Sequence, residues 1–192
     1  MRKLVVAITG TPGTGKSTFA KRLAKRLGSC KVIEINGVVN KNRLYSGKDR
    51  FGSKIVDIGK LNRAMETEIK KARKGVVLVV GHLVPDLELH QNMTIVLRAE
   101  LKTLMKRFER RGYPEGKMRE NLVAEATDYC GIVSRERCAS TYEVETPTER
   151  KRIMAYIVGI SRRAKVKEPP RKAIDKMDEL LELIKEGNRF GL

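Results

Sequence analysis

The stretch Gly10-Thr11-Pro12-Gly13-Thr14-Gly15-Lys16-Ser17 decides the fold of this chain, because it fits the pattern GxxxxGK[ST] at every position. The apolar run Leu4–Ile8 lies directly before it and is typical of a buried parallel strand. After it, apolar residues recur at helical spacing from Phe19 to Leu27, and Gly28 marks the end of that helix. A strand, a glycine-rich loop and a helix in this order predict a loop that wraps around phosphate groups.

The residue types of this loop suit the binding of a nucleotide. Its glycines allow successive backbone N–H groups to turn toward phosphate oxygens, and the N-terminus of the following helix faces the same anion. We expect Lys16 to reach the β- and γ-phosphates of a nucleoside triphosphate and the hydroxyl of Ser17 to coordinate Mg²⁺. When no nucleotide is bound, the side chain of Lys16 is expected to point into solvent.

The composition limits the class of protein. The chain has 192 residues, enough for one domain, and 41 basic residues against 23 acidic ones give it a formal charge of +18. Such an excess attracts polyanions, namely nucleotides, nucleic acid or an acidic protein partner. The cysteines Cys30, Cys130 and Cys138 fit neither a disulfide framework nor a zinc site. No apolar run approaches membrane-spanning length, so we expect a soluble, cytoplasmic protein with no membrane partner.

Apolar runs typical of strands alternate with helical patterns along the chain. Strands are expected at Leu4–Ile8, Val32–Ile35, Val76–Val80, Thr94–Leu97 and Tyr142–Val144. Helices are expected at Gly15–Leu27, Gly59–Lys74, Glu100–Arg110 and Met118–Arg135, with two more after Pro147. This alternation predicts a P-loop NTPase fold, a three-layer α/β/α arrangement around a five-stranded parallel sheet. The polar stretches Asn36–Val56 and Arg110–Arg119 interrupt the pattern and are expected to form mobile covers over a ligand.

Two segments carry a resemblance to a known family. The first is Thr9–Thr18, and the second comprises Val96-Leu97-Arg98, Leu104, Arg107, Arg111-Gly112-Tyr113, Lys117, Glu120-Asn121-Leu122 and Glu125. Over roughly residues 1–146 the chain resembles the adenylate kinase isoenzyme 6 family, nucleoside monophosphate kinase-like ATPases that also serve in maturation of the small ribosomal subunit. The resemblance implies phosphoryl transfer from ATP to a monophosphate, AMP in the first place, with Mg²⁺. It also implies a small-subunit platform ribosomal protein and ribosomal RNA as partners, and the alternative is an ATPase assembly factor with little kinase turnover.

The resemblance assigns roles to residues of this chain. It implies that ATP is bound by Gly10, Gly13, Thr14, Gly15, Lys16, Ser17, Thr18 and Arg111. The stretch Asn36–Asp57 would form the cover over the monophosphate, with Asn36 and Asp57 as binding residues. Residues 110–120 would form a lid. Within this arrangement Arg111 would close onto ATP and Arg107 onto the transferring phosphoryl group, since such transfer needs cations and the exclusion of water. The alternative for Arg111 is a solvated helix end.

The chain departs from the family pattern after the third strand. The family has an acidic residue two places before a histidine, where it supports magnesium-bound water, and this chain has Val80 two places before His82. His82 is then either a catalytic residue that orients a water near the γ-phosphate or a structural residue. Asp86 can replace the missing acid only if its loop folds back. The departure predicts slow hydrolysis of ATP when no acceptor is present.

The segment Glu149–Lys172 has nine basic residues and two acidic ones, and it belongs to a basic extension over about residues 147–192 of a single domain that spans 1–192. Apolar residues from Ile153 to Ile160 form a stripe that is expected to pack on the body of the protein. The charge has two interpretations. It is either a solvated face or a docking surface for ribosomal RNA or for an acidic face of an RNA-binding partner.

Overall fold

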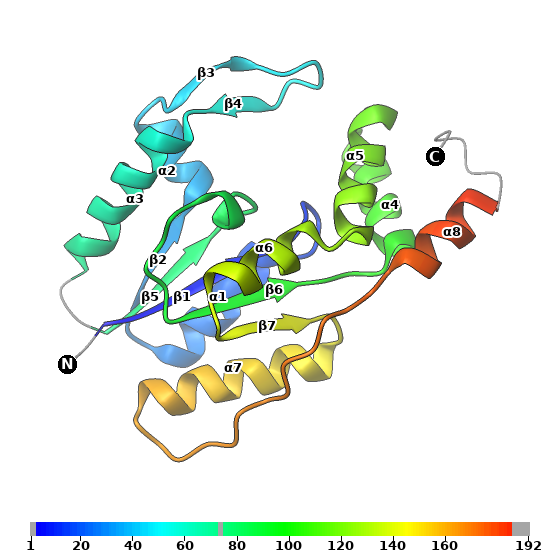
Figure 1. Ribbon diagram of the computed structural model, residues 1–192. Helices are drawn as coiled ribbons and strands as arrows, with labels where there is room; N and C mark the ends of the chain where they lie inside the picture. Colours follow the sequence, from blue (N-terminus) through cyan, green and yellow to red (C-terminus); the bar gives the residue numbers. More distant parts are fainter. Residues whose placement is uncertain (1–2, 73–74, 186–192) are drawn as a thin grey trace.

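A computed structural model describes residues 3–72 and 75–185, and it has the layered architecture that the sequence predicts (Figure 1). Its centre is a five-stranded parallel sheet with the strand order β2-β5-β1-β6-β7. Every residue of β5 and β6 is buried, which explains their unbroken apolar runs. The predicted fold class is confirmed. The strands of this sheet are β1 (Leu4–Thr9), β2 (Cys30–Glu34), β5 (Val76–Val80), β6 (Met93–Leu97) and β7 (Thr141–Val144).

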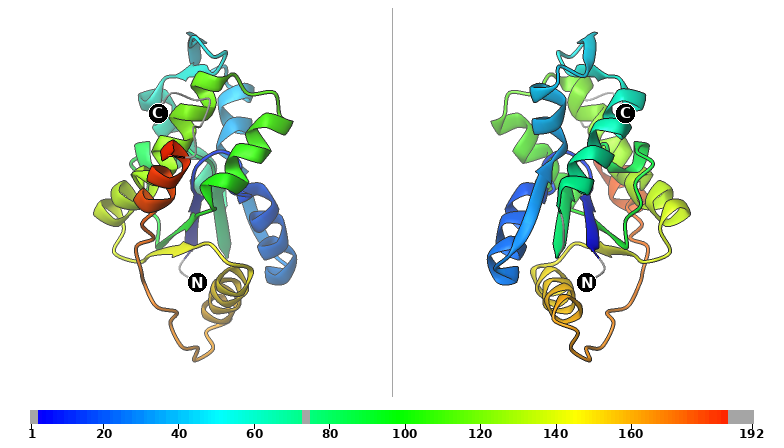
Figure 2. Two further views of the ribbon diagram at one scale, coloured as in Figure 1. Left: turned by 90° about the vertical axis from the view of Figure 1, so that its right-hand side faces the viewer. Right: turned by 90° about the vertical axis from the view of Figure 1, so that its left-hand side faces the viewer.

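Both faces of the sheet are covered by helices. These are α1 (Lys16–Leu27), α2 (Ile35–Lys41), α3 (Ile58–Lys71), α6 (Tyr129–Arg137) and α7 (Pro147–Ser161). Successive residues of a strand point to opposite faces, so Val6 and Ile8 of β1 pack in one apolar cluster with α1 and α7. Val5 and Ala7 pack in another with α2 and α3. Figure 2 shows α1 and α7 on one side of the sheet and α6 on the other.

A third apolar cluster lies beyond the end of β6 and joins α4 (Leu101–Arg110), α5 (Glu115–Ala126) and α8 (Met177–Lys185). It buries Leu104 and Phe108 of α4 against α5 and α8. Within residues 3–72 and 75–185, no helix is long and apolar enough to cross a membrane.

The predicted helix over Met118–Arg135 is wrong, because the structure divides this region into α5 and α6. The break lies at Asp128, whose backbone has a φ of 54° in the left-handed region. A short polar side chain tolerates this conformation better than most. The carboxylate of Asp128 accepts hydrogen bonds from Arg98 and Arg135, and these contacts hold the turn. Local helical spacing cannot reveal the break, because Arg98 belongs to a distant part of the chain.

The two predicted covers contain regular structure. The stretch Asn36–Val56 holds most of α2 and an antiparallel hairpin of β3 (Tyr45–Lys48) and β4 (Lys54–Val56). The stretch Arg110–Arg119 holds the end of α4, a turn at Gly112 and the start of α5. Residues from both stretches border one cavity, so their position agrees with the prediction of covers over a ligand.

Two helices follow β7 in the part of the chain that the structure describes, as the sequence predicts. They are α7, which begins with a capping box between Thr146 and Glu149, and α8. The predicted apolar stripe is seated on the sheet through Ile153, Met154 and Ile157. Residues 162–176 form neither helix nor strand, and Figure 1 shows this segment returning past β7 to α8. We call it the C-terminal strap.

Candidate functional site

The loop between β1 and α1 has the tight shape that its sequence predicts. At Gly10 an added Cβ would lie 2.2 Å from the carbonyl oxygen of Leu97, so only glycine fits between the loop and the end of β6. The hydroxyl of Thr14 donates a hydrogen bond to the carbonyl oxygen of Thr11 across the loop, at 2.9 Å. Gly15 has a φ of 96°, which orients the backbone where α1 begins. The loop is therefore a preformed backbone cradle at a helix N-terminus, the arrangement that binds phosphate.

The ammonium group of Lys16 lies within this loop. It donates hydrogen bonds to the carbonyl oxygens of Gly10 and Thr11, at 2.7 and 2.9 Å. The expectation that this side chain points into solvent was wrong, because the loop supplies acceptors for it. Burial lowers the pKa of Lys16 to about 8, since desolvation disfavours the charged form. An anion bound beside Lys16 would stabilise its charge.

Two cavities meet at the loop. The larger cavity, about 910 Å³, is bordered by the loop, the ends of β2 and β5, the hairpin and α5, and its lining includes Lys16, Ser17, Thr18, Glu34, Asn36, Val80, His82 and Arg111. The smaller cavity, about 500 Å³, lies between the loop, α1, α4 and α7, and it is lined by Gly13, Thr14, Gly15, Thr18, Phe19, Arg22, Arg107, Arg110, Arg111, Arg150 and Met154. Arg111 borders both cavities. Most of the predicted site residues are thus brought together around the loop.

A carboxylate missed by sequence reasoning borders the larger cavity. Glu34 ends β2 and pairs in register with Val80, the position where the family pattern has its acid. An oxygen of Glu34 lies 3.5 Å from the hydroxyl oxygen of Ser17. Asp86 instead accepts a hydrogen bond from the hydroxyl of Tyr129 and borders neither cavity. The available signal was the place of Glu34 at the carboxyl end of a parallel strand, where α/β folds bind ligands.

His82 follows β5 and borders the larger cavity, as predicted. Desolvation at the cavity border and the nearby charge of Lys16 together lower its pKa to about 4, although His82 is still exposed to water. The imidazole is therefore neutral at physiological pH. A neutral ring can accept one hydrogen bond and donate another, which suits the orientation of a polar group in the cavity.

The predicted lid arginines occupy different places. Arg107 lines only the smaller cavity, and its guanidinium donates a hydrogen bond of 2.7 Å to the carbonyl oxygen of Gly13. Arg111 caps the end of α4 between the two cavities. Arg150 belongs to the basic segment Glu149–Lys172, for which the sequence allows a solvated face or a docking surface, but it lies against the loop in the smaller cavity. Sequence reasoning missed it because α7 follows the matched family segments and reaches the loop only through the fold.

The two residues predicted to bind a monophosphate also differ in position. Asn36 borders the larger cavity, at the start of α2. The carboxylate of Asp57 accepts a hydrogen bond of 2.9 Å from the N–H of Lys60 and so caps the start of α3. Asp57 borders neither cavity. Asp57 therefore acts as a helix cap, at the point where the hairpin ends and α3 begins.

The hairpin and α5 touch each other across the larger cavity. The guanidinium of Arg50 and the carboxylate of Glu120 form an exposed ion pair at 2.6 Å. The ring of Phe51 lies against Gly116, where an added Cβ would come within 2.7 Å of it. The two predicted covers therefore meet at their tips and partly enclose the space between them.

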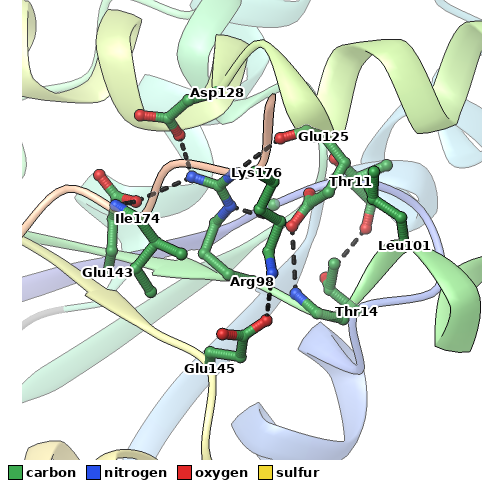
Figure 3. A network of polar contacts seen from close by, with 12 residues as sticks. Thr11, Thr14, Arg98, Leu101, Glu125, Asp128, Glu143, Glu145, Ile174 and Lys176 are labelled. Carbon is green, nitrogen blue, oxygen red and sulfur yellow. Dashed lines mark hydrogen bonds and ion pairs between the residues drawn. The ribbon is translucent and has the colours of Figure 1, made fainter. Parts of the chain in front are cut away.

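Behind the loop, Arg98 is buried in a network of carboxylates (Figure 3). It follows β6 and donates hydrogen bonds to Glu125 at 2.9 Å, to Glu143 at 2.8 Å and to Asp128. Burial raises the pKa of Glu143. These contacts join β6 to β7, to α5 and to the turn before α6. The network fixes the ends of the strands that carry the loop and the lid helices.

The C-terminal strap is tied to the same network. The N–H of Ile174 donates to the carboxylate of Glu143 at 2.9 Å. The ammonium of Lys176 is buried between Glu145 at 2.5 Å and Glu179 at 2.7 Å (Figure 3 labels the first pair). Glu179 also accepts a hydrogen bond of 2.9 Å from the N–H of Leu101, the first residue of α4. The strap and α8 are thereby attached to the helix that carries Arg107.

Comparison with known proteins agrees with this geometry. A family model described as an AAA domain matches residues 6–128. The chain is similar to the "Putative adenylate kinase" of Methanocaldococcus jannaschii, with 40% identity over 144 residues that cover 73% of this chain and 76% of the relative. It is also similar to the protein of the same name in Pyrococcus furiosus, with 35% identity over 145 residues that cover 74% and 75%.

Solved structures share the fold at lower identity. TT1252 from Thermus thermophilus has a TM-score of 0.57 and 17% identity, and the match covers 83% of this chain and 98% of that one. Shikimate kinase from Acinetobacter baumannii has a TM-score of 0.50 and 18% identity, with 85% and 96% covered. These likenesses show the fold alone. The family model and the archaeal relatives show more: the chain belongs to the AAA-domain family and to that of the archaeal "Putative adenylate kinase" proteins, and it is a P-loop phosphotransferase.

Proposed function

We propose that this protein transfers the γ-phosphoryl group of ATP to AMP and so forms two molecules of ADP. The observation that carries the proposal is the pair of cavities that meet at the phosphate-binding loop, with Arg111 on the border of both. The smaller cavity would hold the donor ATP and the larger one the acceptor monophosphate, with Asn36 among its contacts. The names of the archaeal relatives support the same reaction.

The placement of the cations suggests their roles. Phosphoryl transfer depends mainly on positioning and on positive charge around the moving group. Lys16 at the loop and Arg111 between the cavities would meet the γ-phosphoryl group. Arg107, which lines only the smaller cavity, would hold phosphates of the donor. This assignment exchanges the roles that the family resemblance implies for the two arginines.

Ser17 and Glu34 are the side chains that would hold Mg²⁺. Their oxygens lie 3.5 Å apart at the border of the larger cavity, and both are the hard oxygen donors that this ion prefers. Mg²⁺ binds few protein ligands and keeps several waters, so two side chains together with phosphates are sufficient. When bound, the ion would neutralise charge on the β- and γ-phosphate oxygens. The neutral ring of His82 would orient a water or a group of the acceptor.

The contact between the hairpin and α5 would exclude water during transfer. Arg50 pairs with Glu120, and Phe51 packs on Gly116, above the larger cavity. Closure of such covers protects the phosphoryl group from hydrolysis and favours the monophosphate as acceptor. The acceptor would have to enter between the two covers, so these contacts would open and close in each cycle.

A coupled assay of ADP production tests this function. ATP and Mg²⁺ are supplied with AMP, CMP, GMP or UMP in turn, and the rate with AMP is expected to be the highest and to exceed the rate without acceptor. Lys16→Ala should abolish the activity. The matched control Lys21→Ala, an exposed residue of α1 that borders neither cavity, should not. Equal rates with and without every monophosphate would refute the proposal.

A second candidate function is that of an ATPase assembly factor that binds RNA and a ribosomal protein in the cytoplasm. The observation in its favour is the number of exposed cations on α1 and α7, two helices that contact each other, and on the strap. Exposed cations lie on α1, at the two ends of α7 and on the strap, and no acidic residue occurs in residues 16–27 or 150–167. They are Lys21, Arg22, Lys25, Arg26, Lys151, Arg152, Arg162, Arg163, Lys165 and Lys167. The ribosomal partners stay a prediction from the resemblance.

The salt dependence of RNA binding tests this second function. Affinity for RNA phosphates should fall steeply with salt, by close to one logarithmic unit per phosphate neutralised, with weak sequence preference. Reversal of Lys151, Arg152, Arg162 and Arg163 to Glu should abolish RNA binding and leave ATP binding intact. Arg150 is left unchanged in this variant, because it lines the smaller cavity. Absence of RNA binding by the wild-type protein at low salt would remove this candidate.

A further inference from the structure

Arg150 occupies an unusual position for a residue of the last helix on the sheet. It lies in the first turn of α7, yet its side chain reaches the phosphate-binding loop. Its Nη1 atom is 3.5 Å from the place that a Cβ on Gly15 would take, and it borders the smaller cavity beside Arg107. A guanidinium is therefore presented to the same space as the backbone of the loop.

The hydrogen-bonding capacity of Arg150 is mostly unused. Its Nη2 atom donates one bond of 2.8 Å to the carbonyl oxygen of Arg98. Its Nε atom is buried and has no partner, and no carboxylate forms an ion pair with Arg150 anywhere in residues 3–72 and 75–185. A guanidinium carries five N–H donors, and leaving such donors buried without acceptors is unfavourable. Arg150 thus has one buried donor without a partner, while its Nη1 group faces the smaller cavity with no partner among the described residues.

The neighbours of Arg150 add further positive charge to the smaller cavity. Arg22, Arg107, Arg110 and Arg111 line the same cavity, and none of them has a carboxylate partner in the part of the chain that the structure describes. Burial lowers the pKa of Arg150, and the charge of Arg107 lowers it further. A neutral base or sugar would not compensate so much charge. A group with several negative charges would.

We infer that Arg150 binds the non-transferred phosphates of the donor nucleotide, a role that rests on the proposed phosphoryl transfer. The position of Arg150 favours the non-transferred phosphates over the γ-phosphate. Lys16, which would meet the γ-phosphate, borders only the larger cavity, whereas Gly15 and Thr18 border both cavities. The γ-phosphoryl group would lie toward Lys16 and the acceptor. The remaining phosphates would extend into the smaller cavity, within reach of the free donors of Arg150.

This position predicts a particular kinetic signature. A contact to the α-phosphate is equally strong in the ground state and the transition state, so it changes substrate binding and leaves the chemical step unaltered. A contact to the β-phosphate, which gains charge as the leaving group, would also stabilise the transition state. Replacement of Arg150 should raise KM for ATP and weaken ADP binding, with KM for AMP nearly unchanged, and a fall in kcat would report contact with the β-phosphate. A residue that only supported the fold through the carbonyl of Arg98 would alter thermal stability instead.

Binding measurements on Arg150→Gln and Arg150→Lys test the inference. The probes are ATP, ADP, inorganic tripolyphosphate and adenosine, and the matched control is Arg63→Gln, an exposed residue of α3 that borders neither cavity. Loss of a charge-assisted hydrogen bond should weaken ATP, ADP and tripolyphosphate binding to Arg150→Gln by about tenfold to a hundredfold. Adenosine binding should be unchanged, and Arg150→Lys should retain most of the phosphate affinity.

The outcomes separate this inference from the proposed function. Unchanged tripolyphosphate binding by Arg150→Gln, or an equal loss of adenosine binding, would overturn the role of Arg150. A reduced melting temperature of both variants with normal phosphate binding would also overturn it, in favour of a structural role. If the wild-type protein does not phosphorylate AMP but Arg150→Gln still loses tripolyphosphate, the proposed reaction fails and the phosphate contact stands.

Discussion

Arg98 and Arg150 are joined by a hydrogen bond, but their surroundings are opposite. The side chain of Arg98 is 1% exposed and forms ion pairs with Glu125, Asp128 and Glu143. Among the described residues, Arg150 donates a hydrogen bond only to a carbonyl oxygen and has no ion pair. Lys16 resembles Arg150, because its partners are also carbonyl oxygens of the chain.

The difference separates the charges that hold the fold from those that await a ligand. Burial alone would lower the pKa of Arg98, but its three carboxylate neighbours outweigh burial and raise it. Around Lys16, burial outweighs the charges of Glu125 and Glu34, which act in the opposite direction, and its pKa falls to about 8. Paired buried charges should therefore affect stability when removed, and unpaired ones should affect binding.

The largest effect is expected for Arg98→Met, which removes the paired charge. Glu125, Asp128 and Glu143 would remain beside one another without their common cation, and the free energy of unfolding should fall by about 3–5 kcal/mol. Urea denaturation followed by circular dichroism measures this loss. The matched control Arg135→Gln removes a cation that is 38% exposed and pairs with two of the same carboxylates, so it should cost about 1 kcal/mol or less. Equal losses of unfolding free energy in the two variants would show that the buried, paired charge of Arg98 has no special part in stability.

Lys16→Ala should show the reverse pattern. Removal of the charge next to the phosphates should reduce turnover by about a hundredfold or more. Stability without nucleotide should change by only about 1 kcal/mol, because two carbonyl oxygens lose a donor while a desolvated charge is also removed. Steady-state kinetics and thermal unfolding of the same preparation provide both values. Unaltered turnover would mean that the loop does not act on phosphates.

Glu34→Gln should shift the magnesium requirement. If Glu34 supports the ion beside Ser17, the Mg²⁺ concentration for half-maximal activity should rise by about tenfold. Asp86→Asn is the matched control and should leave it unchanged, because Asp86 borders neither cavity. Val80→Asp, which adds a carboxylate in register with Glu34, should raise the slow hydrolysis of ATP without acceptor. If only Asp86→Asn raised the Mg²⁺ concentration for half-maximal activity, the ion would be bound near Asp86 and not beside Glu34.

The smallest effect concerns pH. Free Lys16 loses its proton above about pH 8, and bound phosphates would raise its pKa. Binding of ATP should therefore take up a proton in this range, and affinity should fall a few-fold between pH 8 and 9. Calorimetry in two buffers with different ionisation enthalpies measures the uptake. Proton uptake by Lys16→Ala equal to that of the wild type would assign it to another group.

The sequence predicts those parts of the molecule whose structure depends on residues that are close together along the chain. The glycine-rich loop, the apolar strands and the stripe of α7 all follow from local patterns, and the structure confirms them. The break at Asp128 could not be predicted, because it depends on Arg98 from a different strand. The acid Glu34 was missed for the same reason, since only the register of β2 with β5 places it beside Val80. Residue roles around the cavities stay predictions until the experiments above are done.

The attachment of α8 has a consequence for the order in which the site can be assembled during synthesis. The helix α4, which carries Arg107 and ends at Arg111, buries its apolar face against α5 and α8, and Glu179 of α8 accepts a hydrogen bond from its first residue. The phosphate-binding loop and β1 leave the ribosome first, but β1 pairs with β5 and β6, so the cradle needs the chain up to residue 97. The packing of α4 against α8 needs the chain up to residue 185. A growing chain can therefore complete its anion-binding backbone before the helix that carries these two arginines is fully packed.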